Sequence, residues 1–299
     1  MKEDTMPFAI EESLCVHCGS CASNCPNRAI VRRGAQYEVT TMCCDCGTCR
    51  HYCPMEPKAI GQGKTRTDFD NKKIARAMKE KLSLEKGIAA MKYADKPPQG
   101  IPVEDGINFW CHICGDMFEG IGSPTYFTAK VSSCGGSSLI GIGSRGTDRD
   151  AFSAVIDAFV IGEGKSYASV DVWPAGKSFF PRMPKVYGGV VIGPLERVKM
   201  PDIILFPINA HQLSVISTAY TFDTGDIIRG YGGTSQCTMT VPAPLIENRP
   251  VFASGDHGGR NHMRLTEAEL VMSFPYKLVP GLIKNLDRTI YAYEAAEGA

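Results

Sequence analysis

The chain has 299 residues, 43% of them hydrophobic, which is enough to bury the cores of about two domains. Lys and Arg together number 32, as do Asp and Glu, and the resulting zero net charge argues against nucleic acid or an acidic membrane surface as a partner. The charged N-terminus lacks the apolar run of a signal peptide, and no window approaches the roughly 18 apolar residues of a membrane span. We therefore expect a cytoplasmic protein.

The 13 cysteines are distributed unevenly, with nine between Cys15 and Cys53 and four in the rest of the chain. An odd number without a secretory signal argues against a framework of disulfides. Clustered cysteines in a reducing compartment are typical of metal or redox chemistry. The distribution predicts a redox protein of an anaerobic cytoplasm.

Two cysteine runs near the N-terminus share the pattern C-x-x-C-x-x-C-x-x-x-C-P. The first run contains Cys15, Cys18, Cys21 and Cys25, and the second contains Cys43, Cys46, Cys49 and Cys53. Three closely spaced thiolates can hold one face of an iron–sulfur cubane while the fourth reaches another cluster. Four-cysteine zinc sites need longer spacers between their pairs, so the spacing favours clusters over zinc. The segment 29–41 between the runs alternates around Gly34 and predicts a small hairpin.

Residues 1–63 resemble a two-cluster bacterial-type ferredoxin domain, and the resemblance implies two [4Fe-4S] clusters with crossed ligands. It assigns one cluster to Cys15, Cys18, Cys21 and Cys53, and the other to Cys43, Cys46, Cys49 and Cys25. Cys44 is left over as a neighbour of a cluster, and His17 and His51 are expected at the surface or near a cluster. Because the module has no flavin or nicotinamide motif, it needs a redox partner protein as donor or acceptor.

Residues 64–90 are expected to link two domains through an amphipathic helix. Ile74, Met78 and Leu82 recur there at helical spacing, with charged residues opposite. A short apolar strand and a Pro-Pro turn follow at 87–102.

Residues 91–299 alternate between helical and strand-like runs, which predicts an α/β or α+β domain. Strands are expected at 125–133, 185–195 and 201–208, of which the last two are apolar in the manner of buried strands. Helices are expected at 148–162 and 209–225.

A further helix is expected at 266–275. Thr266 and Glu269 there form the Thr-x-x-Glu pattern of a capping box.

Residues 78–286 resemble the uncharacterised domain of unknown function family 169, through pieces such as "FWCHICG", "SSCGGSS", "GGTSQC" and "GDHGGRN". The resemblance implies no particular reaction, but it indicates which loops matter. The family often carries a further cysteine near the last of these pieces, whereas this chain has 256–260 without one.

Cys111, Cys134 and Cys237 each lie beside turn-forming or small polar residues in three separate segments. We predict that they hold a third [4Fe-4S] cluster and form the catalytic centre. Its fourth iron position would be open to substrate or filled by Cys114, His112 or His257. Two alternatives remain: a reactive thiol or Cys111/Cys114 dithiol, and simple packing of cysteines in the core.

Cys134 is followed by Gly135 and Gly136, which let the backbone approach a cofactor. Unpaired backbone N–H groups at such a turn can stabilise a thiolate and lower its pKa. Residues 141–146 match G-x-G-x-x-G, but a cysteine turn stands where a dinucleotide site needs a strand. We expect a pocket loop in which Arg145 binds an anionic group.

Two more glycine-rich loops, 230–237 and 255–262, are candidates for lining a ligand site. In the first, Gly232 and Gly233 would face a cofactor. In the second, His257, Arg260 and His262 would supply acid–base chemistry or bind an anion; the alternative is a tight turn with exposed polar side chains.

Together these features predict an iron–sulfur oxidoreductase whose ferredoxin clusters pass electrons to the cysteine site of the second domain. An electron-transfer or adaptor subunit of a larger redox complex is the main alternative, and a cofactor-binding or maturation protein is a third. A small-molecule substrate and an oligomeric assembly are both compatible with the sequence.

Overall fold

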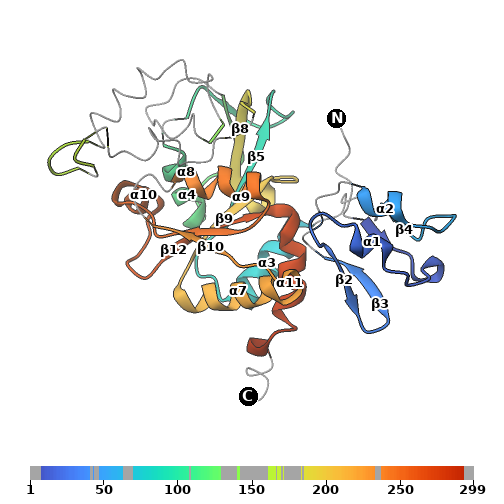
Figure 1. Ribbon diagram of the computed structural model, residues 1–299. Helices are drawn as coiled ribbons and strands as arrows, with labels where there is room; N and C mark the ends of the chain where they lie inside the picture. The colour runs from blue at the N-terminus through green and yellow to red at the C-terminus, as the bar shows by residue number, and fades with distance from the viewer. Residues whose placement is uncertain are drawn as a thin grey trace. The chain divides into compact units, whose positions relative to one another are not determined.

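The computed structural model describes residues 8–40, 43, 47–62, 70–107, 109–128, 140–141, 161–165, 167–169, 171, 183, 185–232 and 237–292. The chain divides into two compact units (Figure 1). One contains 1–70, 214–227 and 277–299, and the other contains 71–213 and 228–276. In the described parts, no helix has the length and apolar character needed to cross a membrane.

Two small antiparallel sheets and two short helices form the N-terminal part of the first unit. Its elements are β1 (Phe8–Ile10), η1 (Glu12–Leu14), α1 (Ser20–Ser23), β2 (Ile30–Arg33), β3 (Gln36–Val39), α2 (Thr48–Tyr52) and β4 (Ile60–Gln62). Strand β1 pairs with β4, and β2 pairs with β3. The hairpin predicted around Gly34 is confirmed, and Gly34 has the positive φ of 62° that its tight turn requires.

The two short helices occupy equivalent positions in the two cysteine runs. Each is preceded by a glycine in the left-handed conformation, Gly19 with φ 78° before α1 and Gly47 with φ 76° before α2. A side chain at this φ is strained, which explains why a glycine follows the second cysteine of each run. The sequence repeat is therefore also a repeat of backbone conformation.

An eight-stranded sheet organises the second unit, in the order β10-β11-β12-β9-β5-β8-β7-β6. Its strands are β5 (Ala89–Ala94), β6 (Val103–Glu104), β7 (Thr125–Thr128), β8 (Gly189–Pro194), β9 (Ile203–Ile208), β10 (Arg229–Tyr231), β11 (Val251–Ala253) and β12 (Leu270–Pro275). The described pairs are antiparallel except at the two ends, where β10 runs parallel to β11 and β6 to β7. The predicted mixed helix-and-strand class is confirmed, and within it the antiparallel pairing identifies the domain as α+β.

Among the helices from α3 onward, two agree with features predicted from the sequence: the buried face of α3 and the end of α7. They are α3 (Asn71–Leu82), α4 (Trp110–Phe118), η4 (Leu195–Arg197), α7 (Ala210–Thr224), α8 (Cys237–Thr240), α9 (Pro242–Glu247), α10 (His257–Met263), η5 (Tyr276–Leu278) and α11 (Val279–Leu286). Helix α3 buries Ile74, Met78 and Leu82, as its periodicity predicted. Helix α7 stops just before Gly225, which has φ 65°.

The helix predicted at 266–275 is wrong, because this segment forms β12. The main-chain N–H of Thr266 does donate to Glu269 Oε2 at 2.7 Å, but the bond closes an isolated turn. The apolar run that follows lies between β11 and β9 and is almost fully buried, so pairing within the sheet outweighs the local helix signal. Of the helix predicted at 148–162, residues 148–160 lie outside the described residues.

The core of the second unit packs α4 against the sheet. Trp110 and Phe118 are fully buried in it together with residues of β5, β8 and β9. Helix α10 packs against α4 (Figure 1). Phe109, just before α4, stacks on His262 of α10 with their ring centroids 4.8 Å apart. Two glycine- and histidine-containing segments, far apart in sequence, are thus neighbours.

Gly115→Ala is expected to destabilise this helix pair, because an added Cβ would overlap the carbonyl oxygen of His262. Overpacking against a main-chain atom costs about 1–3 kcal/mol in the free energy of unfolding, which a denaturant titration measures. The matched control is Gly258→Ala on α10, where the nearest atom to the new Cβ, an Asp256 carboxylate oxygen, is 3.7 Å away. A Gly115 variant as stable as the control would contradict the close packing.

Candidate metal centres

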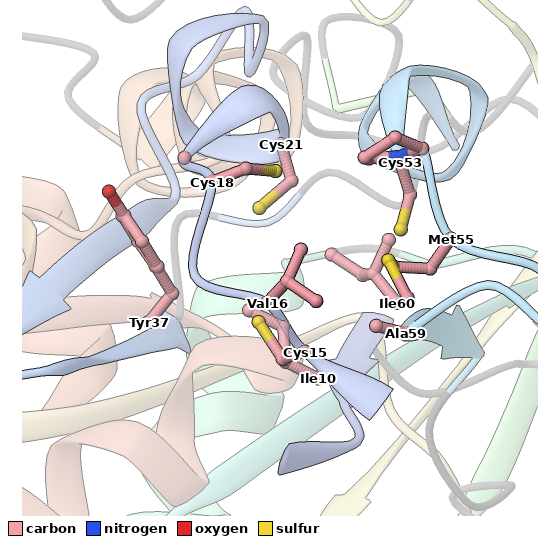
Figure 2. A pocket seen from close by; sticks show the side chains of 12 residues that line it. Ile10, Cys15, Val16, Cys18, Cys21, Tyr37, Cys53, Met55, Ala59 and Ile60 are labelled. Atoms are coloured by element: carbon pink, nitrogen blue, oxygen red, sulfur yellow. The ribbon is translucent and has the colours of Figure 1, made fainter. Parts of the chain in front are cut away.

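Four cysteines drawn from both runs line one cavity of the N-terminal unit (Figure 2). They are Cys15, Cys18, Cys21 and Cys53. The cavity spans about 330 Å³, part of which is open to solvent. Most of its remaining wall is apolar, from Ile10, Val16, Tyr37, Met55, Ala59 and Ile60 among others. The helices α1 and α2 and the chain beside them carry these thiols to one place.

A second cavity, which spans about 300 Å³ including space open to solvent, is lined by Cys25, Cys43 and Cys49. Phe8, Ile30 and Val39 contribute apolar walls, and Gly47 lies beside them. Cys46, the fourth predicted ligand of this set, and the leftover Cys44 are outside the described residues.

The two cavities group the cysteines across the two runs. Cys53 ends the second run but lies with the first three cysteines, and Cys25 ends the first run but lies with the second set. This grouping is the one that crossed ligation requires. Cluster ligation by these residues remains a prediction.

Hydrogen bonds reach several of the sulfur atoms. The Ser20 hydroxyl lies 3.5 Å from Cys18 Sγ and lowers the pKa of that exposed thiol. The main-chain N–H of Ala29 donates to Cys25 Sγ at 3.2 Å. Burial raises the pKa of Cys21, with the backbone N–H of its neighbour opposing the shift. Donors aimed at sulfur favour the thiolate, which is the form that binds metal.

The two histidines of the runs differ in their surroundings. His17 Nδ1 is 3.9 Å from Cys15 Sγ and its Nε2 is 3.5 Å from Glu12 Oε1, so this ring lies next to the first thiol set. His51 is exposed and packs edge-on against Tyr52.

The donor set and the cavity walls fit an iron–sulfur cluster. Thiolates are the usual ligands of such clusters, and apolar walls limit water around them. Among the described residues, no three His, Cys, Asp or Glu side chains come close enough to hold a single metal ion. In the first set, four thiols surround a space instead of converging on a point, which suits a cluster better than a tetrahedral zinc ion.

The predicted third cysteine site is only partly described. Cys111 and Cys114 lie on α4 and are 5% and 0% exposed within the apolar core. Burial, reinforced by the nearby Cys111, raises the pKa of the Cys114 thiol well above its usual range, so without a bound metal this thiol stays protonated. Cys237 is the first residue of α8, but its side chain is outside the described part of the chain, as is all of Cys134.

The predicted cofactor loops are also incompletely described: Gly135, Gly136, Arg145 and Gly233 fall outside the described residues. Gly232 is exposed, with open space where a side chain would lie. Gly141 has φ 84°, and a Cβ there would lie 2.9 Å from Met183 Cβ, so close packing accounts for this glycine.

The polar residues of α10 are engaged with the protein itself. The Arg260 guanidinium donates to the main-chain carbonyls of Ser254, Thr266 and Glu269, the last at 3.1 Å. These bonds tie the start of α10 to the turn before β12 and favour the structural alternative for Arg260. His257 Nε2 lies 3.3 Å from Asn261 Nδ2.

Sequence reasoning missed several residues around the first cavity. Tyr37 lines it from β3, and its hydroxyl would lie 2.7 Å from a Cβ at Gly19. The Lys58 ammonium donates to the carbonyl oxygen of Cys53 at 2.9 Å. The hairpin pattern placed Tyr37 on a strand, but only the packing of that hairpin brings it to the thiols.

These features define an iron–sulfur protein with a ferredoxin-type electron-transfer domain, and the model of the 4Fe-4S binding domain matches residues 8–31. The chain belongs to the family DUF169, described as uncharacterised ArCR, whose model matches residues 77–285. Comparison with the curated proteins and with the solved structures found no match. The chain therefore joins a 4Fe-4S binding domain to a family domain whose role is open.

Proposed function

We propose that residues 1–63 form a two-cluster module in which each [4Fe-4S] cluster takes three ligands from one cysteine run and one from the other. The observation that carries this proposal is the exchange of Cys53 and Cys25 between the two cavities. Cys46 would complete the second set. This module would pass single electrons between redox partner proteins and the rest of the chain.

The residues of the module hold and tune the clusters. When bound, a cluster supplies one-electron redox chemistry. The Ser20 hydroxyl and the Ala29 N–H stabilise negative charge on the sulfurs of Cys18 and Cys25. The buried side chain of Ile60 helps to limit water at the first cavity. Hydrogen bonds to the sulfur atoms and solvent exposure both influence the reduction potential of a bound cluster.

The family domain would receive the electrons at a site made by Cys111, Cys134 and Cys237, which would make the protein an oxidoreductase of an anaerobic cytoplasm. The residue before Cys111, Trp110, supports a bound group at this site. Trp110 is fully buried, and its indole N–H has no hydrogen-bond partner among the described residues. A buried donor left unpaired is costly, so an acceptor is expected beside it, and a sulfur-rich bound group would supply one.

A non-catalytic electron-transfer or adaptor subunit is the second candidate. The observation that favours it is the burial of Cys111 and Cys114 in an apolar core, where cysteine often acts as a small hydrophobic residue. In that case the family domain would bind a partner enzyme and hold no cluster.

A reductive titration tests the proposal. The protein is reconstituted with iron and sulfide under anaerobic conditions and titrated with dithionite, while electron paramagnetic resonance follows the clusters. The two-cluster module predicts about two electrons per chain, and a third cluster predicts about three. Uptake of one electron or fewer per chain would contradict the two-cluster module. Uptake of two electrons per chain would favour the adaptor subunit over a third cluster.

A further inference from the structure

His17 lies against one of the four sulfur atoms of the first cavity. Its ring Nδ1 is 3.9 Å from Cys15 Sγ, within reach of an N–H···S hydrogen bond, which is longer than a bond to oxygen because sulfur is the larger atom. Cys15 lines the cavity (Figure 2), whereas His17 is not among the residues of its wall. The ring therefore reaches the thiol set from outside and takes no space from a cluster.

The backbone and a carboxylate both orient this ring. His17 has φ 55°, a left-handed conformation that residues other than glycine rarely adopt. Its side chain is 36% exposed, so core packing does not account for this strained backbone. Glu12 Oε1 lies 3.5 Å from the other ring nitrogen, Nε2. Thiolate and carboxylate are both hydrogen-bond acceptors, so each ring nitrogen faces a group that favours an N–H.

A hydrogen bond to a ligand sulfur changes the redox equilibrium of a cluster. Reduction adds one negative charge, which is shared by the cluster and its thiolate sulfurs. A donor aimed at such a sulfur stabilises the reduced state more than the oxidised state, so it raises the reduction potential. A hydrogen bond to a charged acceptor is strong enough to change the equilibrium constant about tenfold, which is about 59 mV for a one-electron couple.

We propose that His17 donates a hydrogen bond from Nδ1 to Cys15 Sγ and thereby raises the reduction potential of the cluster in the first cavity. The inference rests on the proposed two-cluster function and adds a residue that tunes one of the clusters. One electron passes from a redox partner protein to this cluster, no covalent bond forms or breaks, and the proton stays on the ring of His17. A higher potential makes the first cavity a more stable place for that electron.

Two nearly isosteric variants test the donor. Asparagine places an amide N–H where Nδ1 lies, aspartate places an oxygen there, and both residues tolerate a left-handed backbone. The second run carries aspartate, Asp45, at the position equivalent to His17, so the motif admits this residue. His17→Asp is expected to lower the potential of the first cluster by about 59 mV, which is about tenfold in the equilibrium constant for reduction.

His17→Asn is expected to keep the wild-type potential to within about twofold in the equilibrium constant. The amide does not ionise near neutral pH, so equal potentials for histidine and asparagine would ascribe the effect to the hydrogen bond and not to charge on the ring.

The measurement is a potentiometric titration of the reconstituted full chain at one fixed pH, followed by electron paramagnetic resonance. The signal of the first cluster is the one that Cys25→Ala retains, since Cys25 lines the other cavity. The matched control is His51→Asp, because His51 is exposed, packs against Tyr52 and lines neither cavity. It is expected to change the equilibrium constant of the first cluster by less than about twofold, since solvent and salt screen an exposed charge.

Three results would overturn the role of His17. They are an unchanged potential in an iron-replete His17→Asp variant, a His17→Asn potential as low as that of His17→Asp, and an equal shift in His51→Asp. If His17→Asp loses iron, His17→Gly replaces it, because glycine adopts the left-handed backbone without strain and removes the donor. The potential of His17→Gly must then be lower than that of the wild type. A wild type that holds no more than about four iron atoms would instead contradict the two-cluster module.

Discussion

Cys25→Ala is expected to remove the cluster of the second cavity, although Cys25 belongs to the first cysteine run. The reason is its place beside Cys43 and Cys49, away from the first thiol set. Loss of one of four thiolates leaves one iron open to water, and in a module whose four positions are all filled by cysteine we expect the weakened cluster to be lost. Of the iron held by the two module clusters, about four of about eight atoms should be lost, as measured by iron and sulfide analysis.

Double variants identify which cluster is lost. Cys25→Ala combined with Cys49→Ala should lose no more iron than either change alone, because both remove the same cluster. Cys25→Ala combined with Cys18→Ala should empty both cavities, since Cys18 lines the first. The reverse outcome, in which Cys25 and Cys18 behave as ligands of one cluster, would show that ligation follows the runs and would contradict the crossed arrangement.

Cys237→Ala and Cys134→Ala are each expected to remove a third cluster from the family domain. The reconstituted wild type would then hold about twelve iron atoms, and each variant about eight, with the resonance signals of the two ferredoxin-type clusters unchanged. The physical basis is the burial of Cys111 in the core, directly after Trp110, whose buried indole N–H has no hydrogen-bond partner among the described residues. Anaerobic iron analysis and electron paramagnetic resonance measure both effects.

Cys114→Ala is the control for these variants. Its side chain is fully buried among apolar residues of the core, where a cysteine often acts as a packing residue. Its replacement should lower stability through lost packing and leave the iron content unchanged. The third cluster would be contradicted if the wild type held no more than about eight iron atoms and if Cys134→Ala and Cys237→Ala left that iron content unchanged. This result would favour the adaptor subunit.

Local sequence patterns predicted a helix and a hairpin correctly, because in each segment one structural signal dominates. The helix 71–82 follows from the spacing of Ile74, Met78 and Leu82, and the hairpin from the glycine at its turn. The prediction failed at 266–275, where Thr266 and Glu269 carry a helix-start signal but the next residues lie in the middle of a sheet. The hydrogen bonds of a local helix start stabilise the fold less at this place than the burial of an apolar strand does.

The cysteine spacing is enough to predict iron–sulfur chemistry in the N-terminal part, because a cubane needs thiolates at short, fixed spacings that few other sites share. The structure adds that the glycines after Cys18 and Cys46 are left-handed, a conformation in which a side chain is strained. The ferredoxin resemblance already implied how the cysteines divide into two sets, and the two cavities group them in the same way, whereas the packing of α4 on α10 through Gly115 is visible in the fold alone. That packing depends on contacts between segments distant along the chain, and no local pattern encodes such contacts.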